Sequence, residues 1–346
     1  MKKIHKNKVF EGEHAIGDFL TPGSMGPTPL VELPASLNPF TKDKVRIFIK
    51  LVNLVPLFNI KSQPAHMMLD NIPRDELKKI KNLVEYSSGN TALSLAVLAQ
   101  YFGIEKMYAI ITPDVPESKK RILRLVGTNL LISHGPKSPD VKEDVGGIYD
   151  AKLMGQKPGW HNLHQYINPG NWEAGEEYVG KELWQQLGTE LSFFTSSIGT
   201  AGTITGAGKY LKSKNKKLKV LGVAVKEGSS IPGPRGEVMI HKLGIEWQNT
   251  VDEVSAVETF NAFKSGLDLI RAGFFVGPST GMQLSALLDK IREYKKKGQL
   301  KNLKNENGEV VSCFIACDSM FPYIDEYFDN LPDNLFPRVK DLPAGR

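Results

Sequence analysis

The chain has 346 residues, 41% hydrophobic and 24% charged, which is ordinary for a globular protein long enough to hold two domains. Its net charge of +6 comes from scattered or short lysine runs without interleaved aromatic residues, which favours a solvated surface over nucleic-acid binding. No apolar run approaches the roughly 20 residues that span a bilayer, and the charged N-terminus lacks a signal core, so a cytoplasmic protein without membrane contact is expected.

The first half of the chain alternates strands with helices. Strands are predicted at 45–51, 107–112 and 129–132, and helices at 64–71, 92–101, 116–126 and 140–152. Such alternation is typical of βαβ units that build a parallel sheet. The stretch 160–171 is predicted to be irregular.

The alternation restarts in the second half. Strands are predicted at 191–196, 218–225, 276–281 and 310–315, and helices at 172–187, 203–212, 257–272 and 282–297. Two α/β units are therefore expected: an N-terminal unit at 44–167 and a C-terminal unit at 168–335, joined by residues 20–43. Each should be a parallel sheet between helical layers.

The two cysteines do not indicate a metal site. Cys313 and Cys317 lie in or just after an apolar strand and have no partners at zinc-ligand spacing. We interpret them as small buried hydrophobic residues, and no metal is expected. So few cysteines also favour a reducing compartment.

A polar turn at 84–91 is the first candidate site. It contains Ser87, Ser88, Gly89, Asn90 and Thr91 and opens a helix. Free backbone N–H groups and the helix dipole at such a position attract an anion. A purely structural helix cap is the more frequent explanation for one isolated turn of this kind.

Two further features raise the weight of that turn. The loop at 199–203 also joins a strand to a helix, and its glycines and threonines could cradle a phosphate. It lacks both the Walker lysine and the dinucleotide-binding spacing. Lys61 lies in a third polar turn upstream. In parallel sheets, ligands bind beyond the carboxyl ends of strands, where both loops lie.

Six motifs together resemble the fold-type-II pyridoxal-phosphate enzymes, and within them the cysteine synthase and cystathionine β-synthase family. They occur in the family's order from about residue 28 to 325: Thr28-Pro29-Leu30, Asn59-Ile60-Lys61, Ser87-Ser88-Gly89-Asn90-Thr91, Gln165-Tyr166-Ile167-Asn168-Pro169, Gly199-Thr200-Ala201-Gly202-Thr203 and Gly277-Pro278-Ser279-Thr280-Gly281. The resemblance implies two three-layer αβα domains like those of tryptophan synthase β, of which the smaller N-terminal one moves, and a homodimer.

The resemblance also implies roles for the cofactor site. Lys61 would form a Schiff base with pyridoxal 5′-phosphate and later remove the α-proton of the substrate. Asn90 would contact the 3′-oxygen, and Ser279, or alternatively Thr280, the pyridine nitrogen. The phosphate would bind the loop formed by Gly199, Thr200, Ala201, Gly202 and Thr203.

The substrate would bind beside the cofactor. The resemblance implies that its carboxylate is held by Ser87, Ser88, Thr91 and Gln165. The expected reaction is β-replacement on an activated serine, with O-acetylserine and sulfide giving cysteine and acetate. Alternatives are cystathionine synthesis, diaminopropionate-type synthesis with an amine, elimination or deamination, a catalytically silent relative, and a nucleotide-binding protein.

The chain departs from the family pattern at several positions. Ser62-Gln63 replaces the usual Asp-Arg after the lysine, so the local support of the cofactor turn must differ. Ala201 replaces a glycine, a small change if its φ is negative. Ala92 replaces a second glycine, and Val225-Lys226 stands where Glu-Pro is usual. These changes bear on the substrate more than on the cofactor.

Overall fold

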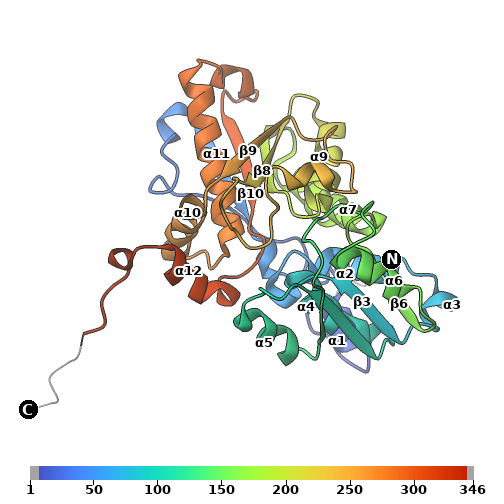
Figure 1. Cartoon of the computed structure of the whole chain (residues 1–346). Coiled ribbons are helices and arrows are strands. Elements are labelled where there is room, and N and C mark those ends of the chain that lie inside the picture. The colour runs from blue at the N-terminus through green and yellow to red at the C-terminus, as the bar shows by residue number, and fades with distance from the viewer. Residues whose placement is uncertain (1–7, 341–346) are drawn as a thin grey trace, which may run out of the picture.

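The computed structural model describes residues 8–340 and contains two separate sheets with helices around each (Figure 1). The larger sheet has the strand order β1-β2-β10-β7-β8-β9. Its strands are β1 (Leu30–Glu32), β2 (Val45–Lys50), β7 (Leu191–Ser197), β8 (Lys219–Val225), β9 (Glu253–Val257) and β10 (Val310–Ile315). All neighbours in it run parallel except β1 and β2, which are antiparallel.

The smaller sheet is parallel throughout, with the order β5-β4-β3-β6. Its strands are β3 (Asn82–Tyr86), β4 (Lys106–Ile111), β5 (Asn129–Ile132) and β6 (Trp160–Asn162). The helices that accompany it are α2 (Ser62–Asp70), α4 (Asn90–Ala99), α5 (Glu117–Leu125) and α6 (Gly147–Gly155). The α/β class predicted from the alternation is confirmed.

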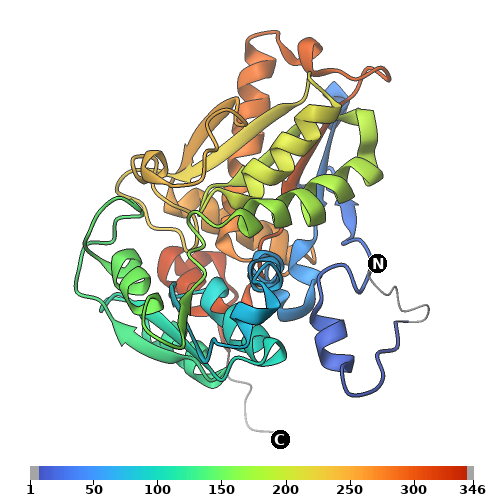
Figure 2. The ribbon, with the colours of Figure 1, turned by 90° about the vertical axis from the view of Figure 1, so that its right-hand side faces the viewer.

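The larger sheet is the middle of three layers. Successive side chains of its strands point to opposite faces, and each face packs against helices. Phe193 belongs to the apolar cluster that includes residues of α10 and α11, whereas its neighbour Phe194 belongs to the cluster that includes residues of α9. Figure 2 shows these two helical layers on opposite sides of the sheet. The flanking helices are α7 (Pro169–Gly175), α8 (Lys181–Leu187), α9 (Gly202–Lys214), α10 (Thr259–Arg271) and α11 (Pro278–Lys296).

Strand β2 lies in the larger sheet, although the predicted boundary at residue 44 would place it in the N-terminal unit. It pairs with β10 along its whole length, from Val45 beside Val310 to Lys50 beside Ile315. Along the described chain, the first two strands therefore belong to the larger sheet, the next four build the smaller one, and the rest return to the larger sheet. Alternation of strands and helices cannot reveal this, because it does not say which sheet a strand joins.

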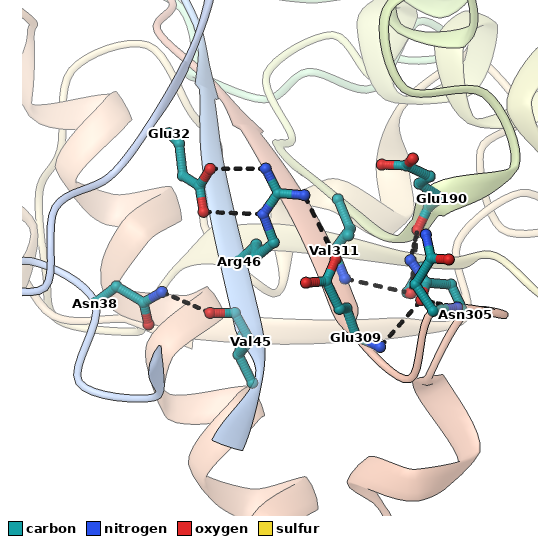
Figure 3. A network of polar contacts seen from close by, with 10 residues as sticks. Glu32, Asn38, Val45, Arg46, Glu190, Asn305, Glu309 and Val311 are labelled. Atoms are coloured by element: carbon teal, nitrogen blue, oxygen red, sulfur yellow. Dashed lines mark hydrogen bonds and ion pairs between the residues drawn. The ribbon is translucent and has the colours of Figure 1, made fainter. Parts of the chain in front are cut away.

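A polar network covers the start of β2 (Figure 3). Arg46 donates two hydrogen bonds to Glu32 of β1, at 3.0 and 2.8 Å, and also lies 3.4 Å from a carboxylate oxygen of Glu309. Beside it, Asn38 donates to the carbonyl of Val45 at 2.8 Å. These contacts join β1, β2 and the residue before β10.

Two predicted elements differ from the structure, and some of its strands were not predicted. The helix predicted at 140–152 is the shorter α6, which starts after Gly146, whose φ is +86°. The strand predicted at 276–281 is wrong, because α11 already begins at Pro278, a residue suited to the first helical turn. The stretch that forms β6 is predicted to be irregular, and no strand is predicted where β9 lies. β6 has three residues and β9 has exposed alternate positions, so neither shows a strong apolar pattern.

Between residues 8 and 340, no helix is both long and apolar enough to cross a membrane. The same residues contain no group of three or more His, Cys, Asp or Glu side chains that could hold a metal ion.

Candidate functional site

A cavity of about 360 Å³ lies where the carboxyl ends of strands from both sheets meet. Its lining brings together residues from distant parts of the sequence: Lys61, Tyr86, Ser87, Ser88, Gly89, Asn90, Thr91, Asp114, Lys119, Lys137, Gln165, Tyr166, Gly199, Thr200, Arg235 and Tyr323, among others. Eight of the twelve side chains or loop residues predicted for the site are in this list. The other four, Ala201, Gly202, Thr203 and Ser279, lie outside the lining.

Lys61 stands immediately before helix α2. The turn that presents it is fixed to the end of the larger sheet, because Ile60 N–H donates to the carbonyl of Cys317 at 2.7 Å. Ser62, one of the departures from the family pattern, donates its hydroxyl to the carbonyl of Asn59 at 2.9 Å. A neutral hydrogen bond therefore supports this turn where the family has a charge pair.

Burial lowers the pKa of the Lys61 amine, and the nearby Cys317 and Asp318 oppose that shift. A lowered pKa increases the fraction of the amine that is neutral. Only the neutral amine has the lone pair needed to attack a carbonyl carbon or to accept a proton.

The Ser87 turn serves as a helix cap and leaves donors for a ligand. The Ser87 hydroxyl oxygen accepts hydrogen bonds from the backbone N–H groups of Gly89 and Ala92, at 3.4 and 3.3 Å. These bonds use the oxygen lone pairs, so the hydroxyl hydrogen can still be donated. The structural interpretation and the anion-binding interpretation of this turn are therefore compatible.

Gln165 and Thr91 hold each other in place. The Thr91 hydroxyl donates to Gln165 Oε1 at 2.9 Å, and Gln165 Nε2 donates to the carbonyl of Tyr86 at 3.0 Å. Both side chains are buried. An amide nitrogen carries two hydrogens, so one remains on Gln165 Nε2 for a carboxylate.

Asn171 joins Gln165 to the loop at 199–203, the glycine loop, and the sequence analysis missed it. Its Nδ2 donates to the carbonyl of Gln165 at 2.6 Å and to the hydroxyl oxygen of Thr200 at 2.9 Å. Its Oδ1 would lie 2.1 Å from a Cβ at Gly202, so no larger residue fits there without a shift. The sequence signal that could have pointed to Asn171 is its position two residues after the Asn168-Pro169 pair.

The loop before α9 offers backbone N–H donors. Among the described residues, the backbone N–H groups from Gly199 to Thr203 donate to no protein acceptor, as expected at a helix start. Helix α9 is 13 residues long and adds its dipole. Ala201 has φ +70°, so its replacement of glycine is not the small change that a negative angle would have made it.

Ser279 and Thr280 are the two candidates for the contact with the ring nitrogen, and both lie near Cys317. Both are buried in the first turn of α11. The Thr280 hydroxyl oxygen accepts from the backbone N–H of Cys317 at 3.1 Å, so it supports the end of β10. We therefore still predict Ser279 as the partner of the ring nitrogen.

Two carboxyl groups near the site were not singled out from the sequence. Asp318 follows β10 and accepts 2.6 Å hydrogen bonds from Asn90 and Tyr323. Glu85 is the residue before the last in β3, is buried, and accepts from the backbone N–H of Tyr86 and Gln165, at 3.1 and 3.3 Å. Desolvation raises the pKa of Glu85 to about 7 and that of Asp318 to about 6. A single carboxyl residue in a sequence does not reveal such burial.

Comparison with known proteins gives the identity of this arrangement. Residues 22–304 match the family of pyridoxal-phosphate-dependent enzymes. The chain belongs to that family. It is 32% identical to a cysteine synthase of Aquifex aeolicus (strain VF5) over 84% of this chain and 86% of that protein. It is 30% identical to cysteine synthase B of Escherichia coli (strain K12), over 77% and 85%.

A solved structure agrees with the fold. The crystal structure of an O-ureido-L-serine synthase has a TM-score of 0.72 and 20% identity, covering 88% of this chain and 93% of that one. This chain is therefore a fold-type-II pyridoxal-phosphate enzyme of the cysteine synthase family, and its cofactor is pyridoxal 5′-phosphate. The nucleotide-binding and catalytically silent alternatives are accordingly set aside.

The residues of the cavity fit this cofactor. The free N–H groups at the start of α9 suit a phosphate, and the amine of Lys61 suits an aldehyde. Lys61, Asn90, Ser279 and the loop 199–203 are predicted to hold it.

Proposed function

We propose that this pyridoxal-phosphate enzyme forms cysteine by β-replacement, in which sulfide displaces the ester group of an activated serine such as O-acetylserine. The observation that carries the proposal is the position of Lys61. Its amine, with a lowered pKa, shares one cavity with the Ser87–Thr91 turn and with the Gly199–Thr200 end of the glycine loop.

Each group of residues has a task in this proposal. The cofactor, when bound, supplies an electron sink that stabilises negative charge at the α-carbon of an amino acid. Ser87, Ser88, Thr91 and Gln165 hold the substrate carboxylate and thereby fix the direction of the Cα–H bond. Lys61 Nζ accepts the α-proton, because its lowered pKa keeps a larger share of the amine neutral.

The proposal is supported by the two cysteine synthases, each matched over more than three quarters of this chain. The substrate-holding turn and Gln165 are already ordered by their own hydrogen bonds, so little reorganisation is needed to receive a carboxylate. A homodimer stays a prediction from the family resemblance, and a cytoplasmic location stays a prediction from the sequence.

The test combines a chemical label with product analysis. Borohydride reduction of the purified holoenzyme should attach a pyridoxyl group to the peptide that contains Lys61, which mass spectrometry detects. Wild-type enzyme should convert O-acetylserine and sulfide to cysteine, and Lys61→Ala should lose both the label and at least 99% of the rate, on the order of 3 kcal/mol. Label on another lysine, or full activity in Lys61→Ala, would contradict the proposal.

The nucleophile is examined in the same assay. Homocysteine in place of sulfide tests cystathionine formation, and ammonia or an amine tests formation of a diaminopropionate. If either replaced sulfide with a higher kcat/KM, β-replacement would stand and cysteine would not be the product.

A further inference from the structure

A smaller cavity adjoins the main one. It has a volume of about 30 Å³ and lies where helices α4 and α5 meet the segment that precedes α12 (Ile324–Asn330) (Figure 1). We call it the side chamber, and it is lined by Ser88, Gly89, Asn90, Leu93, Lys119, Ile122, Leu123, Pro322 and Tyr323. The two spaces are neighbours, because they share the lining residues Ser88, Gly89, Asn90, Lys119 and Tyr323.

The size of the side chamber restricts what it can hold. A water molecule needs roughly 10–15 Å³ of such space, so a volume of about 30 Å³ admits one or two molecules of that size. Hydrogen sulfide has a single heavy atom and is only slightly larger than water. An amino acid such as homocysteine is several times larger, and it does not fit unless the walls rearrange.

The side chamber combines apolar walls with a positive charge. Its apolar part consists of Leu93, Ile122, Leu123 and Pro322, and Lys119 is the charged side chain among the described residues that line it. Apolar walls hold water poorly and suit a weakly hydrated, polarisable ligand such as a sulfur species. A positive charge beside these walls favours the anion, hydrosulfide, over the neutral molecule.

Lys119 is held in place and keeps donors for a ligand. Its Nζ lies 3.2 Å from Glu326 Oε1 and 5.5 Å from the centre of the Tyr323 ring. The carboxylate of Glu326 is outside the lining of the side chamber. An ammonium group has three N–H donors, and the contact with Glu326 Oε1 uses at most one of them. The others can serve an anion in the side chamber.

The side chamber adjoins the predicted position of the activated serine. The Ser87–Thr91 turn is predicted to hold the substrate carboxylate, and its central residues line both spaces. Asn90, which belongs to this turn, is also predicted to contact the cofactor. A small ligand that leaves the side chamber past the turn therefore enters the space predicted for the substrate.

We propose that the side chamber is the binding site of the second substrate, hydrosulfide, and that Lys119 holds it there. This inference rests on the proposed β-replacement and adds the place from which its nucleophile reaches the activated serine. The ammonium group supplies the opposite charge, and the small apolar space excludes larger nucleophiles.

The reaction balances with hydrosulfide. An electron pair of sulfur forms the Cβ–S bond of cysteine, the Cβ–O bond of O-acetylserine breaks, and its electron pair leaves with acetate. The negative charge that arrives on sulfur departs on acetate, so no proton has to be removed from the nucleophile. A cation that attracts hydrosulfide next to the reaction space raises its local concentration.

The experiment measures the two substrates of the holoenzyme separately. Initial rates of cysteine formation are recorded with varied sulfide at saturating O-acetylserine, and with varied O-acetylserine at saturating sulfide. Lys119→Met removes the charge and keeps an unbranched side chain. It should raise KM for sulfide roughly 10-fold, the size of a lost charge-assisted contact, and change KM for O-acetylserine by less than about twofold.

Glu326→Gln is the matched control, because it breaks the same ion pair and leaves the charge of Lys119 in place. It should keep KM for sulfide within about twofold of the wild-type value. Leu93→Ala tests the size of the side chamber, since it enlarges the space at a half-buried position. Relative to sulfide, its kcat/KM for methanethiol should rise roughly 10-fold over the wild-type ratio.

Binding is tested without turnover by using bromide, a monovalent anion close in size to hydrosulfide. Crystals of the holoenzyme soaked in bromide should show an anomalous scattering peak in the side chamber, within contact distance of Lys119 Nζ. The same soak of Lys119→Met crystals should show no peak there, whereas Glu326→Gln crystals should keep it.

The outcomes separate this inference from the proposed function. If the wild type forms cysteine and Lys119→Met and Glu326→Gln change KM for sulfide equally, the hydrosulfide site is refuted while β-replacement stands. An equal rise of both KM values in Lys119→Met, or wild-type crystals without a bromide peak, also refutes the site. If bromide binds at Lys119 but no activated serine is converted, the proposed function fails and the assignment to hydrosulfide fails with it.

Discussion

The side chain of Asn90 donates a 2.6 Å hydrogen bond to the carboxylate of Asp318, across 228 positions of sequence. Asn90 begins α4 beside the smaller sheet, and Asp318 follows β10 of the larger sheet. The same Asp318 oxygen accepts from the Tyr323 hydroxyl at 2.6 Å. One buried carboxylate thus fixes the predicted cofactor-contacting amide with respect to both sheets.

Replacing that carboxylate should destabilise the protein strongly. Asp318→Ala leaves the Tyr323 hydroxyl and the Asn90 amide without their common acceptor, which should cost about 2–4 kcal/mol of unfolding free energy. Urea titration of the holoenzyme measures this loss. Tyr323→Phe removes only one donor and should cost about 1 kcal/mol. Equal losses in the two variants would show that the Asn90 contact contributes nothing.

The glycine loop is predicted to be strained at Ala201. Its φ of +70° costs a non-glycine residue roughly 1–2 kcal/mol, whereas glycine adds about 0.4–1 kcal/mol of unfolded-state entropy. Ala201→Gly should therefore stabilise the enzyme by about 0.5 kcal/mol, seen as a rise in calorimetric Tm. Ala207→Gly, in the interior of α9, is the control and should lower Tm. A decrease of Tm in both variants would contradict the strain.

Glu85 should make stability depend on pH. Desolvation raises its pKa from 4.5 to about 7 in the folded protein. Between these values the folded state keeps the proton and the unfolded state has lost it, so the free energy of unfolding falls as pH rises. The loss should be complete above pH 7 and be on the order of 3 kcal/mol.

Glu85→Gln removes this titration while keeping the size of the side chain. Urea unfolding of both proteins between pH 4.5 and 8 should show the variant gaining on the wild type as pH rises. Exposed Glu105→Gln serves as the control for the change in net charge. Parallel curves for wild type and Glu85→Gln would mean that Glu85 titrates alike in both states.

Lys50 and Glu182 form a buried ion pair that joins β2 to α8. Lys50 Nζ lies 2.6 Å from Glu182 Oε2 and donates to the carbonyl of Thr28 at 2.8 Å. Glu182→Ala should cost about 3–5 kcal/mol in urea unfolding, because it leaves a fully buried cation without its counter-ion. The double variant Lys50→Met with Glu182→Leu should lose less than Glu182→Ala alone. A loss in the double variant equal to the sum of the losses of Lys50→Met and Glu182→Leu, each measured alone, would exclude coupling.

The sequence predicted the elements that have a strong local pattern. Strands such as β10, buried along its whole length, and the polar loops that follow β3 and β7 could be recognised because each carries its signal within a few residues. The class of fold followed from the alternation of these elements. The joining of β2 to β10 could not be predicted, since it depends on a contact between residues far apart in sequence.

The candidate site likewise combines residues that a local motif reveals with residues that depend on distant contacts. Lys61, Asn90 and Gln165 could be selected because motifs surround them. Asn171 and Asp318 gain their importance from partners that only the fold supplies: a carbonyl and a distant amide. The positive φ of Ala201 was likewise invisible, because alanine adopts negative angles almost everywhere.

The position of β10 between β2 and β7 also bears on how the chain is synthesised. The smaller sheet is encoded by one continuous stretch, 82–162, and can fold while the ribosome is still translating. The larger sheet cannot close until residues 310–315 emerge, so the apolar strand 45–50 keeps an unpaired edge through most of translation. Nascent chains stalled before residue 310 should therefore stay bound to chaperones longer than chains that already include residues 310–315.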